Sequence, residues 1–354
     1  MLRRAGVDVT LVDAWGPGNV RASSGGETRV LRGTYGDRAI YTRMAARAMR
    51  LWSEHDATTQ RQFVVRNGAL WLFRDDDGFG RASVEPMHAE GLPVEWIDVA
   101  EARRRWPHIA LDEVTHVLWE PRAGFAYARR ACEHVVERFV ADGGRYLVGR
   151  VPAVGATGGA LAAITLEDGE ALQADRFVFA CGPWLGTLLP DVVGARIRPS
   201  RQESFYFGTP AGDTRWLPPR MPVWLDYGTQ MFYGIPGNAH RGFKVSDDTA
   251  GATFDPTHGD RSPTPEALAE ARGLLRLRFP LLADAPLLGA EVCQYELTSD
   301  SHFIVDRHPG AANAWIVGGG SGHGFKMGPA MGEYVARLVL DEDESAPEFR
   351  LAHR

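Results

Sequence analysis

The sequence predicts a mixed α/β fold in which a unit with a parallel sheet carries a second part built on a mainly antiparallel sheet. Near the C-terminal end, an apolar strand at residues 314–317 runs into a glycine-rich turn at 318–324, and a helical pattern follows. Near the N-terminal end, residues 7–13 form another expected strand, which ends in an acidic residue. Between residues 197 and 290, aromatic-rich runs separated by turns indicate antiparallel strands.

Composition limits the classes of protein to consider. With 354 residues, of which 44% are hydrophobic and 24% charged, the chain is long enough for a large core and two domains. A net charge of −6 argues against a nucleic-acid partner, which requires a basic face. No apolar run approaches the roughly 20 residues of a membrane helix, and residues 1–6 lack the apolar centre of a secretory signal. We therefore expect a cytoplasmic protein without a membrane span.

The cysteines and acidic residues predict no metal site. Cys132, Cys181 and Cys293 are far apart, odd in number and outside any C-x-x-C pair, so neither a disulfide framework nor a zinc site is indicated. The acidic run at 75–77 lacks the spaced ligands of a calcium-binding loop and is interpreted as a solvated turn.

The N-terminal strand carries the first candidate ligand-binding residue. Residues 2–6 resemble the last turn of a helix that ends at glycine, and the strand at 7–13 follows. In a dinucleotide-binding unit, an acidic residue at the end of the second strand accepts hydrogen bonds from the adenosine ribose. Asp13 fits that role.

The middle of the chain predicts further elements. A helix before Gly143 should bury one face, formed by Cys132, Val135, Val136, Phe139 and Val140. Residues 161–172 predict a hairpin that turns at Asp168 and Gly169, and residues 176–181 predict a buried strand. The antiparallel part contains strand-like runs at 203–207, 223–227, 231–236 and 242–245. A helix is expected to begin after Thr264, an N-cap candidate followed by Pro265.

Three stretches carry sequence motifs. They are the segment from Ser23 to Arg32, which contains G-G-E-T-R; the segment from Cys293, C-x-Y-x-x-T-x-D-x-H-F-I-V-D; and the turn G-S-G-H-G-F-K that ends at Lys326. In this order and spacing they resemble the monomeric sarcosine oxidase and N-methyltryptophan oxidase group of FAD-dependent amine oxidases, within the D-amino-acid-oxidase-like superfamily. The resemblance implies an FAD-binding Rossmann-like domain and a substrate domain with a mainly antiparallel sheet.

The resemblance also implies how FAD would be held. Cys293 would bind it covalently through a thioether to the 8α-methyl carbon, and Val151 would contact adenine through its backbone. Arg29 would lie beside the isoalloxazine ring. The full set of cofactor-binding residues is then Asp13, Ser23, Ser24, Thr28, Arg29, Val151, Gly182, Trp184, Cys293, Gly322, His323, Gly324 and Lys326.

The same resemblance implies residues for substrate and oxygen. Arg32 and Lys326 would bind a substrate carboxylate, which a planar guanidinium suits. Lys244 would activate oxygen as a fixed cation, and Tyr233 would be an active-site tyrosine that contacts the substrate. Arg29, Tyr233 and Lys244 form the expected catalytic set.

Each of these residues has an alternative interpretation. Arg29 and Arg32, three apart, could share the solvated face of a helical turn. Cys293 could be a buried structural cysteine, and Lys244 could be a surface lysine on a strand. His323 could be a general base, although its glycine neighbours favour a packing or cofactor-contact role.

Three features depart from the pattern. Asp248 stands where sarcosine-oxidizing members carry a histidine, and Gly25 likewise replaces a histidine before G-x-T-R. Both changes concern the side of the site where the resemblance implies the substrate binds, and they argue against sarcosine itself as the substrate. The first strand and G-x-G-x-x-G turn are also absent, which we interpret as a mis-assigned start or a truncated chain. Without them, FAD binding should be severely weakened.

The expected activity is oxidation of a secondary or N-methylated amino acid to an imine, with oxygen reduced to hydrogen peroxide. A related dehydrogenase with another electron acceptor and a flavin-free, non-enzymatic protein are the alternatives. The expected domains are residues 1–60, 128–198 and 290–345 for FAD, residues 61–127 and 199–289 for substrate, and a tail at 346–354. The sequence does not specify the oligomeric state.

Overall fold

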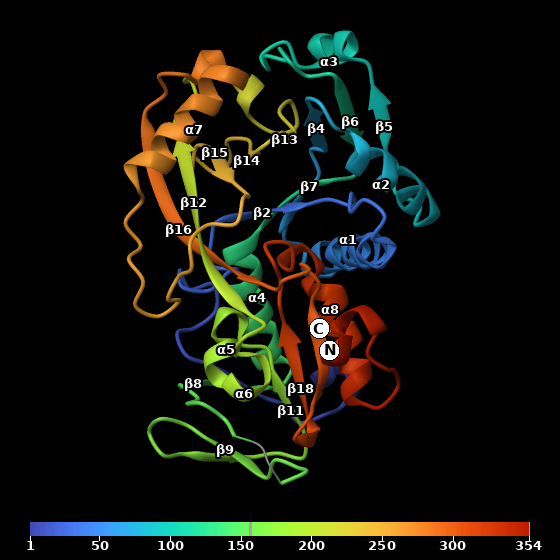
Figure 1. Cartoon of the computed structure of the whole chain (residues 1–354), viewed down its shortest axis with the longest axis vertical. Helices are drawn as coiled ribbons and strands as arrows, with labels where there is room; N and C mark the ends of the chain where they lie inside the picture. Colours follow the sequence, from blue (N-terminus) through green and yellow to red (C-terminus); the bar gives the residue numbers. More distant parts are fainter. Residues whose placement is uncertain (156–157, 354) are drawn as a thin grey trace.

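The computed structural model describes residues 1–155 and 158–353 and has an elongated shape (Figure 1). In the view of Figure 1, an upper part built on a large sheet lies above a lower part that contains several small sheets. The helices are α1 (Ala39–Thr59), α2 (Gly78–Ala89), α3 (Val99–Arg105), α4 (Ala128–Ala141), α5 (Leu185–Leu188), α6 (Pro190–Val193), α7 (Pro265–Arg278) and α8 (Gly328–Val339). Short 3₁₀ turns lie at Leu2–Ala5, Gly182–Trp184, Thr214–Trp216, Pro280–Leu282, Phe325–Met327, Pro347–Phe349 and Leu351–His353.

The strands fall into one large sheet and several small ones. They are β1 (Thr10–Asp13), β2 (Thr28–Leu31), β3 (Val64–Val65), β4 (Ala69–Phe73), β5 (Glu95–Ile97), β6 (His116–Glu120), β7 (Gly124–Tyr127), β8 (Arg145–Val148), β9 (Ala163–Thr165), β10 (Ala171–Gln173), β11 (Phe177–Phe179), β12 (Arg198–Phe207), β13 (Val223–Tyr227), β14 (Met231–Ile235), β15 (Phe243–Asp247), β16 (Leu287–Leu297), β17 (Ile304–His308) and β18 (Ala311–Gly318).

The predicted antiparallel part is confirmed as an eight-stranded sheet in the order β16-β12-β15-β14-β13-β4-β6-β5. Only the β13–β4 pair is parallel within it. Helix α7 begins as predicted, because the Thr264 hydroxyl accepts a hydrogen bond from the Ala267 N–H at 3.3 Å. The aromatic rings of Trp216, Trp224, Phe243 and Phe279 are fully buried and pack together with residues of this helix.

The lower part contains the predicted parallel pairings. Strand β1 pairs in parallel with β8, and β11 pairs in parallel with β18, whose other neighbour is the antiparallel β17. The predicted hairpin forms as β9 and β10. Helix α8 packs on α1 around Tyr41, Trp315 and Val335. The α/β class predicted from the sequence is therefore confirmed.

A large cavity separates the two parallel pairs. Within the described residues, β1 pairs only with β8, and β11 only with β18, so each strand leaves one edge without a strand partner. A cavity of about 1660 Å³ lies against both strands and is lined by residues 7–15 and 176–184, among others.

Helix α4 does not bury the predicted face. Its buried residues are Ala128, Ala131 and His134, whereas Val135 and Val140 are 51% and 49% exposed. The helix turns its small residues toward β2 and β7, where close packing needs little side-chain volume. Apolar spacing alone could not show which face meets the sheet.

Two long strands connect the upper and lower parts. In Figure 1, β12 and β16 run from the upper sheet down beside α4 and α5. They pair along nearly their whole length, from Arg198 opposite Leu297 to Phe207 opposite Leu287. Strand β16 therefore crosses the expected domain boundary at residue 290, and the division into domains stays a prediction.

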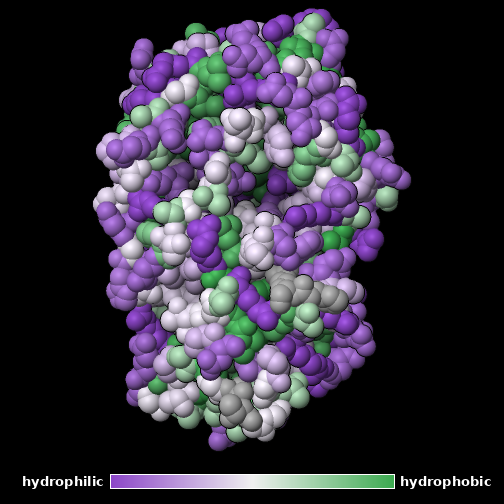
Figure 2. All heavy atoms as spheres, viewed as in Figure 1, coloured by the Kyte–Doolittle hydropathy of each residue, from purple (hydrophilic) through white to green (hydrophobic). Residues whose placement is uncertain are grey.

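The surface shows no large apolar region on the viewed face. Figure 2 shows hydrophilic residues over most of this face, with hydrophobic residues in scattered patches. Among the described helices, none is both long enough and apolar enough to cross a membrane.

A buried ion pair ties the sheet to α7 and yields a stability prediction. Asp226 on β13 accepts hydrogen bonds from Arg74 at 2.7 Å and from Arg278, and both Asp226 and Arg278 are fully buried. We expect Asp226→Asn to lower the free energy of unfolding by about 3 kcal/mol, because it leaves a buried guanidinium without its counter-charge. Urea unfolding measures this change. Asp8→Asn, which alters a fully exposed carboxylate paired with Arg3, should leave the midpoint of urea unfolding unchanged.

Candidate active site

The three motif segments meet at one end of the cavity. Its wall includes Ser23, Ser24 and Arg29 from the N-terminal loop and β2, Tyr295 and Glu296 from β16, and Gly320, Gly322 and Gly324 from the glycine turn. The N-terminal segment is more than 250 residues away from the other two along the chain, and β16 brings it beside the glycine turn.

Arg29 and Cys293 are in direct contact. The Arg29 guanidinium donates hydrogen bonds to the carbonyls of Thr28 at 2.8 Å and Ser23 at 2.5 Å, and it lies 3.4 Å from the Cys293 sulfur. The sulfur also lies 3.7 Å from the Ser23 carbonyl. Cys293 is only partly buried, and its sulfur is held against Arg29 and the loop that carries Ser23 rather than inside an apolar core.

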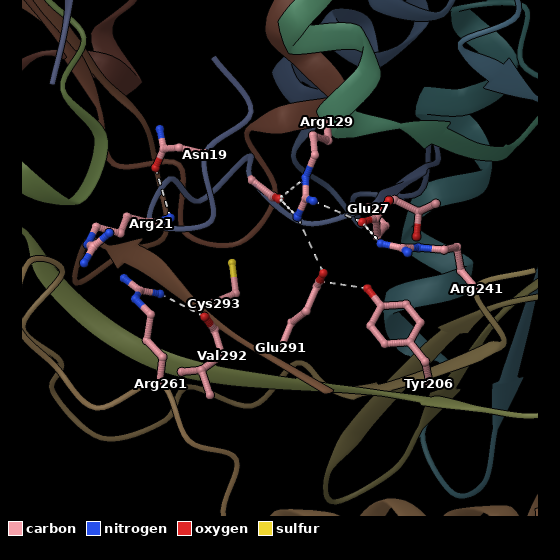
Figure 3. Close-up of polar contacts among 12 residues, drawn as sticks. Asn19, Arg21, Glu27, Arg129, Tyr206, Arg241, Arg261, Glu291, Val292 and Cys293 are labelled. Carbon is pink, nitrogen blue, oxygen red and sulfur yellow. Dashed lines mark hydrogen bonds and ion pairs between the residues drawn. The ribbon is translucent and has the colours of Figure 1, made fainter. Parts of the chain in front are cut away.

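A polar network fixes the loop beside Cys293. Figure 3 shows Arg129 of α4 pointing between Glu27 and Glu291, while the Cys293 sulfur points toward the loop that carries Asn19 and Arg21. Arg129 donates to the Gly25 carbonyl at 2.9 Å and lies 3.2 Å from Glu27. The Tyr206 hydroxyl donates to Glu291 at 2.9 Å. The loop is therefore held by charged groups from α4 and the upper sheet.

Arg32 and Lys326 converge on Tyr35. The Arg32 guanidinium lies 4.7 Å from the centre of the Tyr35 ring and 5.0 Å from that of Trp71. The buried Lys326 ammonium donates to the Tyr35 hydroxyl at 3.0 Å and to the His323 carbonyl at 3.1 Å. Burial, and then the nearby Arg32, hold the pKa of Lys326 well below its usual value. An anion between the two cations would relieve this cost.

The alternative interpretation of the arginine pair, as two side chains on one solvated face of a helical turn, is wrong. Residues 28–31 form strand β2, and the two arginines contact different residues: Arg29, within the strand, contacts Cys293, and Arg32, just after it, contacts Tyr35. Neither is a fully solvated side chain. The strand forms because Thr28 to Leu31 pair with β7.

Glu120 supports this region and was missed by the sequence analysis. It is buried on β6 and accepts hydrogen bonds from the Gly33 N–H at 2.7 Å, from the Trp71 indole at 2.8 Å and from the Thr34 hydroxyl. Its carboxylate therefore fixes the backbone that follows Arg32. No motif marked it, because its partners come from two separate segments, residues 33–34 and Trp71 on β4.

Lys244 is buried beside Tyr233. It is 2% exposed on the central strand β15, so the interpretation as a surface lysine is wrong. Its ammonium lies 5.4 Å from the centre of the Tyr233 ring on the neighbouring strand β14. Lys244 and Tyr233, like Arg32 and Lys326, are not part of the wall of the large cavity among the described residues.

The glycine turn is shaped by two residues of β16. A Cβ on Gly322, whose φ is +80°, would lie 2.7 Å from the Tyr295 ring, so only glycine fits there. Burial raises the pKa of the Glu296 carboxyl to about 7, although the N–H groups of Gly320 and Gly319 oppose this rise. The Oε2 atom of Glu296 is buried and has no hydrogen-bond partner among the described residues. Glu296 was also missed from the sequence.

His323 is a packing residue in this structure. Its ring stacks on Phe303 at 4.8 Å and meets Tyr41 edge-on at 5.0 Å, and its Nε2 lies 3.0 Å from the Ser301 carbonyl. Burial, and then the nearby Lys326, lower its pKa to about 3. A histidine that stays neutral in this environment is a poor general base near neutral pH.

The remaining expected cofactor residues line the far end of the cavity. Asp13, Val151, Gly182 and Trp184 are all in its wall. The Asp13 carboxylate accepts hydrogen bonds from the backbone N–H groups of Trp15 at 2.8 Å and the next residue at 2.9 Å. Trp184 packs against Trp15 at 4.7 Å. Thr28 and Cys293 are not part of this wall, and the Thr28 hydroxyl is buried without a hydrogen-bond partner among the described residues.

The residues present fit FAD at the flavin end. The cavity is long, and it joins aromatic rings at one end to a bare glycine turn at the other. The hydroxyl of Ser23 and one oxygen of Glu296 are buried in its wall without protein partners. Buried polar atoms are normally hydrogen-bonded, so these two indicate a ligand with polar groups at this position.

Comparisons with known proteins agree with this geometry. The family described as FAD dependent oxidoreductase matches residues 1–338. Monomeric sarcosine oxidase from Bacillus sp. (strain B-0618) is 28% identical over 348 residues, covering 96% of this chain and 87% of that protein. N-methyl-L-tryptophan oxidase from Salmonella arizonae is 29% identical over 356 residues, covering 98% of this chain and 91% of that protein.

Solved structures show the same fold. L-proline dehydrogenase from P. horikoshii has a TM-score of 0.84 at 22% identity, covering 99% of this chain and 92% of that chain. Amadoriase I from Aspergillus fumigatus has a TM-score of 0.82 at 20% identity, with coverages of 99% and 85%. At these identities the likeness concerns the fold alone.

The raised pKa of Glu296 predicts a pH dependence of stability. The folded carboxyl has a pKa of about 7 and the ordinary value is 4.5, so between these values the folded protein binds more protons than the unfolded chain. The contribution of Glu296 is therefore complete below pH 4.5 and is lost as the pH rises to 7. Relative to Glu296→Gln, the wild type should lose roughly 1–2 kcal/mol between pH 5 and 7.5. Urea unfolding at both pH values tests this, and parallel curves for the two proteins would contradict it.

Proposed function

Because this chain belongs to the FAD-dependent oxidoreductase family, we propose that it oxidises a secondary or N-methylated amino acid and passes the electrons to oxygen. The products would be an imine, which water hydrolyses, and hydrogen peroxide. The observation that carries the proposal is the two-cation site at Tyr35, together with a nearby cavity whose wall includes Arg29, the residue that contacts Cys293. The names of the curated relatives, which act on sarcosine and N-methyl-L-tryptophan, support an N-methylated substrate.

FAD, when bound, supplies the acceptor for the hydride that leaves the carbon next to nitrogen. Cys293 would hold it covalently, since its sulfur contacts Arg29 and the Ser23 carbonyl, two residues that line the cavity where the ring would lie. The backbone of Gly322 and Gly324 and the side chains of Ser23 and Ser24 would contact it, with Asp13 and Val151 at the adenosine end.

Arg32 and Lys326 would bind the substrate carboxylate from two sides. The lowered pKa of Lys326 reflects a buried cation that lacks enough counter-charge, and a carboxylate would restore its charged form. Both side chains are already fixed by Tyr35, so little side-chain entropy is lost on binding.

Lys244 would serve the reaction with oxygen. A buried ammonium stabilises negative charge that develops on oxygen as it accepts electrons, and its position is fixed before the reaction. Tyr233 lies beside it and would close the same part of the site against water.

The covalent link gives a direct prediction. Protein expressed with ample FAD should stay yellow after acid precipitation, whereas Cys293→Ser should release its flavin into the supernatant. Cys181→Ser, which alters a buried thiol in the cavity wall, is the matched control and should retain colour. Absorbance of pellet and supernatant measures this. Colourless protein in every case would favour the flavin-free alternative.

A substitution of Lys244 distinguishes an oxidase from a dehydrogenase. Lys244→Met should slow reoxidation of the reduced flavin by oxygen by roughly 100-fold or more, because the fixed cation is lost. Reduction by substrate should change little. Stopped-flow absorbance follows each half-reaction separately. Reoxidation at the wild-type rate would contradict an oxygen role for Lys244 and favour another electron acceptor.

A further inference from the structure

Asp248 places a carboxylate in the substrate region, and the proposed reaction does not use it. It follows β15 directly and stands four residues after Lys244, so the two residues belong to the same face of an extended chain. Its backbone N–H donates to the Met231 carbonyl at 2.8 Å, and its Oδ1 accepts a hydrogen bond from the Tyr295 hydroxyl at 2.6 Å. The Tyr295 ring in turn presses against Gly322 of the glycine turn.

We propose that Asp248 binds a positively charged group of the substrate, so that the preferred substrates are N-methylated amino acids with a basic side chain. This inference rests on the proposed function and adds the substrate class to it. The carboxylate is held rigidly by its backbone and by Tyr295, as a recognition group needs to be.

No described residue provides Asp248 with a direct counter-charge. Among the ion pairs within 4 Å in the described residues, none includes Asp248. Its one hydrogen bond from a side chain comes from a neutral phenol, whereas a carboxylate can accept about four. Burial raises the pKa of Asp248, and the Tyr295 hydrogen bond and then Arg32 and Lys326 act against this rise. Burial of a carboxylate favours pairing with a cation.

The two cations near Asp248, Arg32 and Lys326, would bind the substrate carboxylate in the proposed reaction. Arg32 and Lys326 are close enough to affect the pKa of Asp248, yet both are fixed on Tyr35, where a substrate carboxylate would bind. A substrate with only a carboxylate and an amine would use these cations and leave Asp248 without a partner. A second cationic group would pair with it. The reacting amine is an unsuitable partner, because oxidation requires its neutral form and a carboxylate stabilises the ammonium.

Two ligands of equal shape test the charge recognition. Nα-methyl-L-arginine and Nα-methyl-L-citrulline differ in the charge of the side-chain end group and little in size. We expect the wild type to bind the arginine compound at least roughly tenfold more tightly, because a hydrogen-bonded charge pair is formed. Asp248→Asn keeps the shape of the side chain and an oxygen that accepts the Tyr295 hydrogen bond. It should remove most of the preference for the arginine compound. Isothermal titration calorimetry measures both affinities.

Asp247→Asn is the matched control. Asp247 is the adjacent carboxylate, and it lines a separate small cavity of about 210 Å³ beside Arg201 and Gln202. The Asp247→Asn variant should keep the wild-type ratio of affinities for the two ligands. Thermal melts of both variants verify that they fold.

Each outcome decides the matter. Wild-type affinities that are equal, that favour citrulline, or that are undetectable for both ligands at millimolar concentration would overturn the role of Asp248. An arginine preference that survives in Asp248→Asn would also overturn it. If the preference depends on Asp248 but neither ligand bleaches the flavin absorbance at 450 nm, charge recognition stands and the proposed oxidation fails.

Discussion

The site depends on the path of one strand, β16. It begins in the eight-stranded sheet and ends beside the glycine turn, and its alternating side chains hold four separate segments. Cys293 meets Arg29, Tyr295 meets Asp248 and the turn, and Glu296 receives the turn's N–H groups. The Gln294 amide donates to the Arg21 carbonyl. Because successive residues of a strand point to opposite faces, one extended segment can reach the loop, the sheet and the turn at once.

The charges around β16 divide the site into two regions. Arg29 lies at the cavity that fits FAD, and Arg32 and Lys326 lie at Tyr35 on the proposed substrate side. Each cation is buried at least in part, which costs free energy unless a counter-charge is near. Glu120 and Asp248 are the carboxylates on the substrate side. Glu120 is fully engaged with backbone and indole donors, whereas Asp248 has a single phenol. This difference distinguishes a structural carboxylate from one available to a ligand.

The sequence pattern predicted many helices and strands correctly, because capping residues, turn residues and the alternation of apolar and polar residues act over a few neighbouring positions. The N-cap at Thr264, the hairpin at Asp168 and the four antiparallel runs all formed where expected. The face of α4 was predicted wrongly, since the burial of a helix face depends on which distant strands cover it. The helical turn at Arg29 was wrong for the same reason, because pairing with β7 overrides local spacing. Glu120 and Glu296 carry no motif, and only their tertiary partners reveal them. The proposed site residues, apart from Asp13, come from the resemblance and not from a physical pattern, and their roles stay predictions.

The central claim is that the cavity between the glycine turn and Arg29 holds an isoalloxazine ring. A crystal structure of protein grown with excess FAD tests it most directly. The account predicts continuous electron density from the Cys293 sulfur to a flat ring that lies against Gly322 and Gly324, with the adenosine end near Asp13. An FAD-soaked crystal with clear density for these side chains and no ring density in the cavity would contradict it.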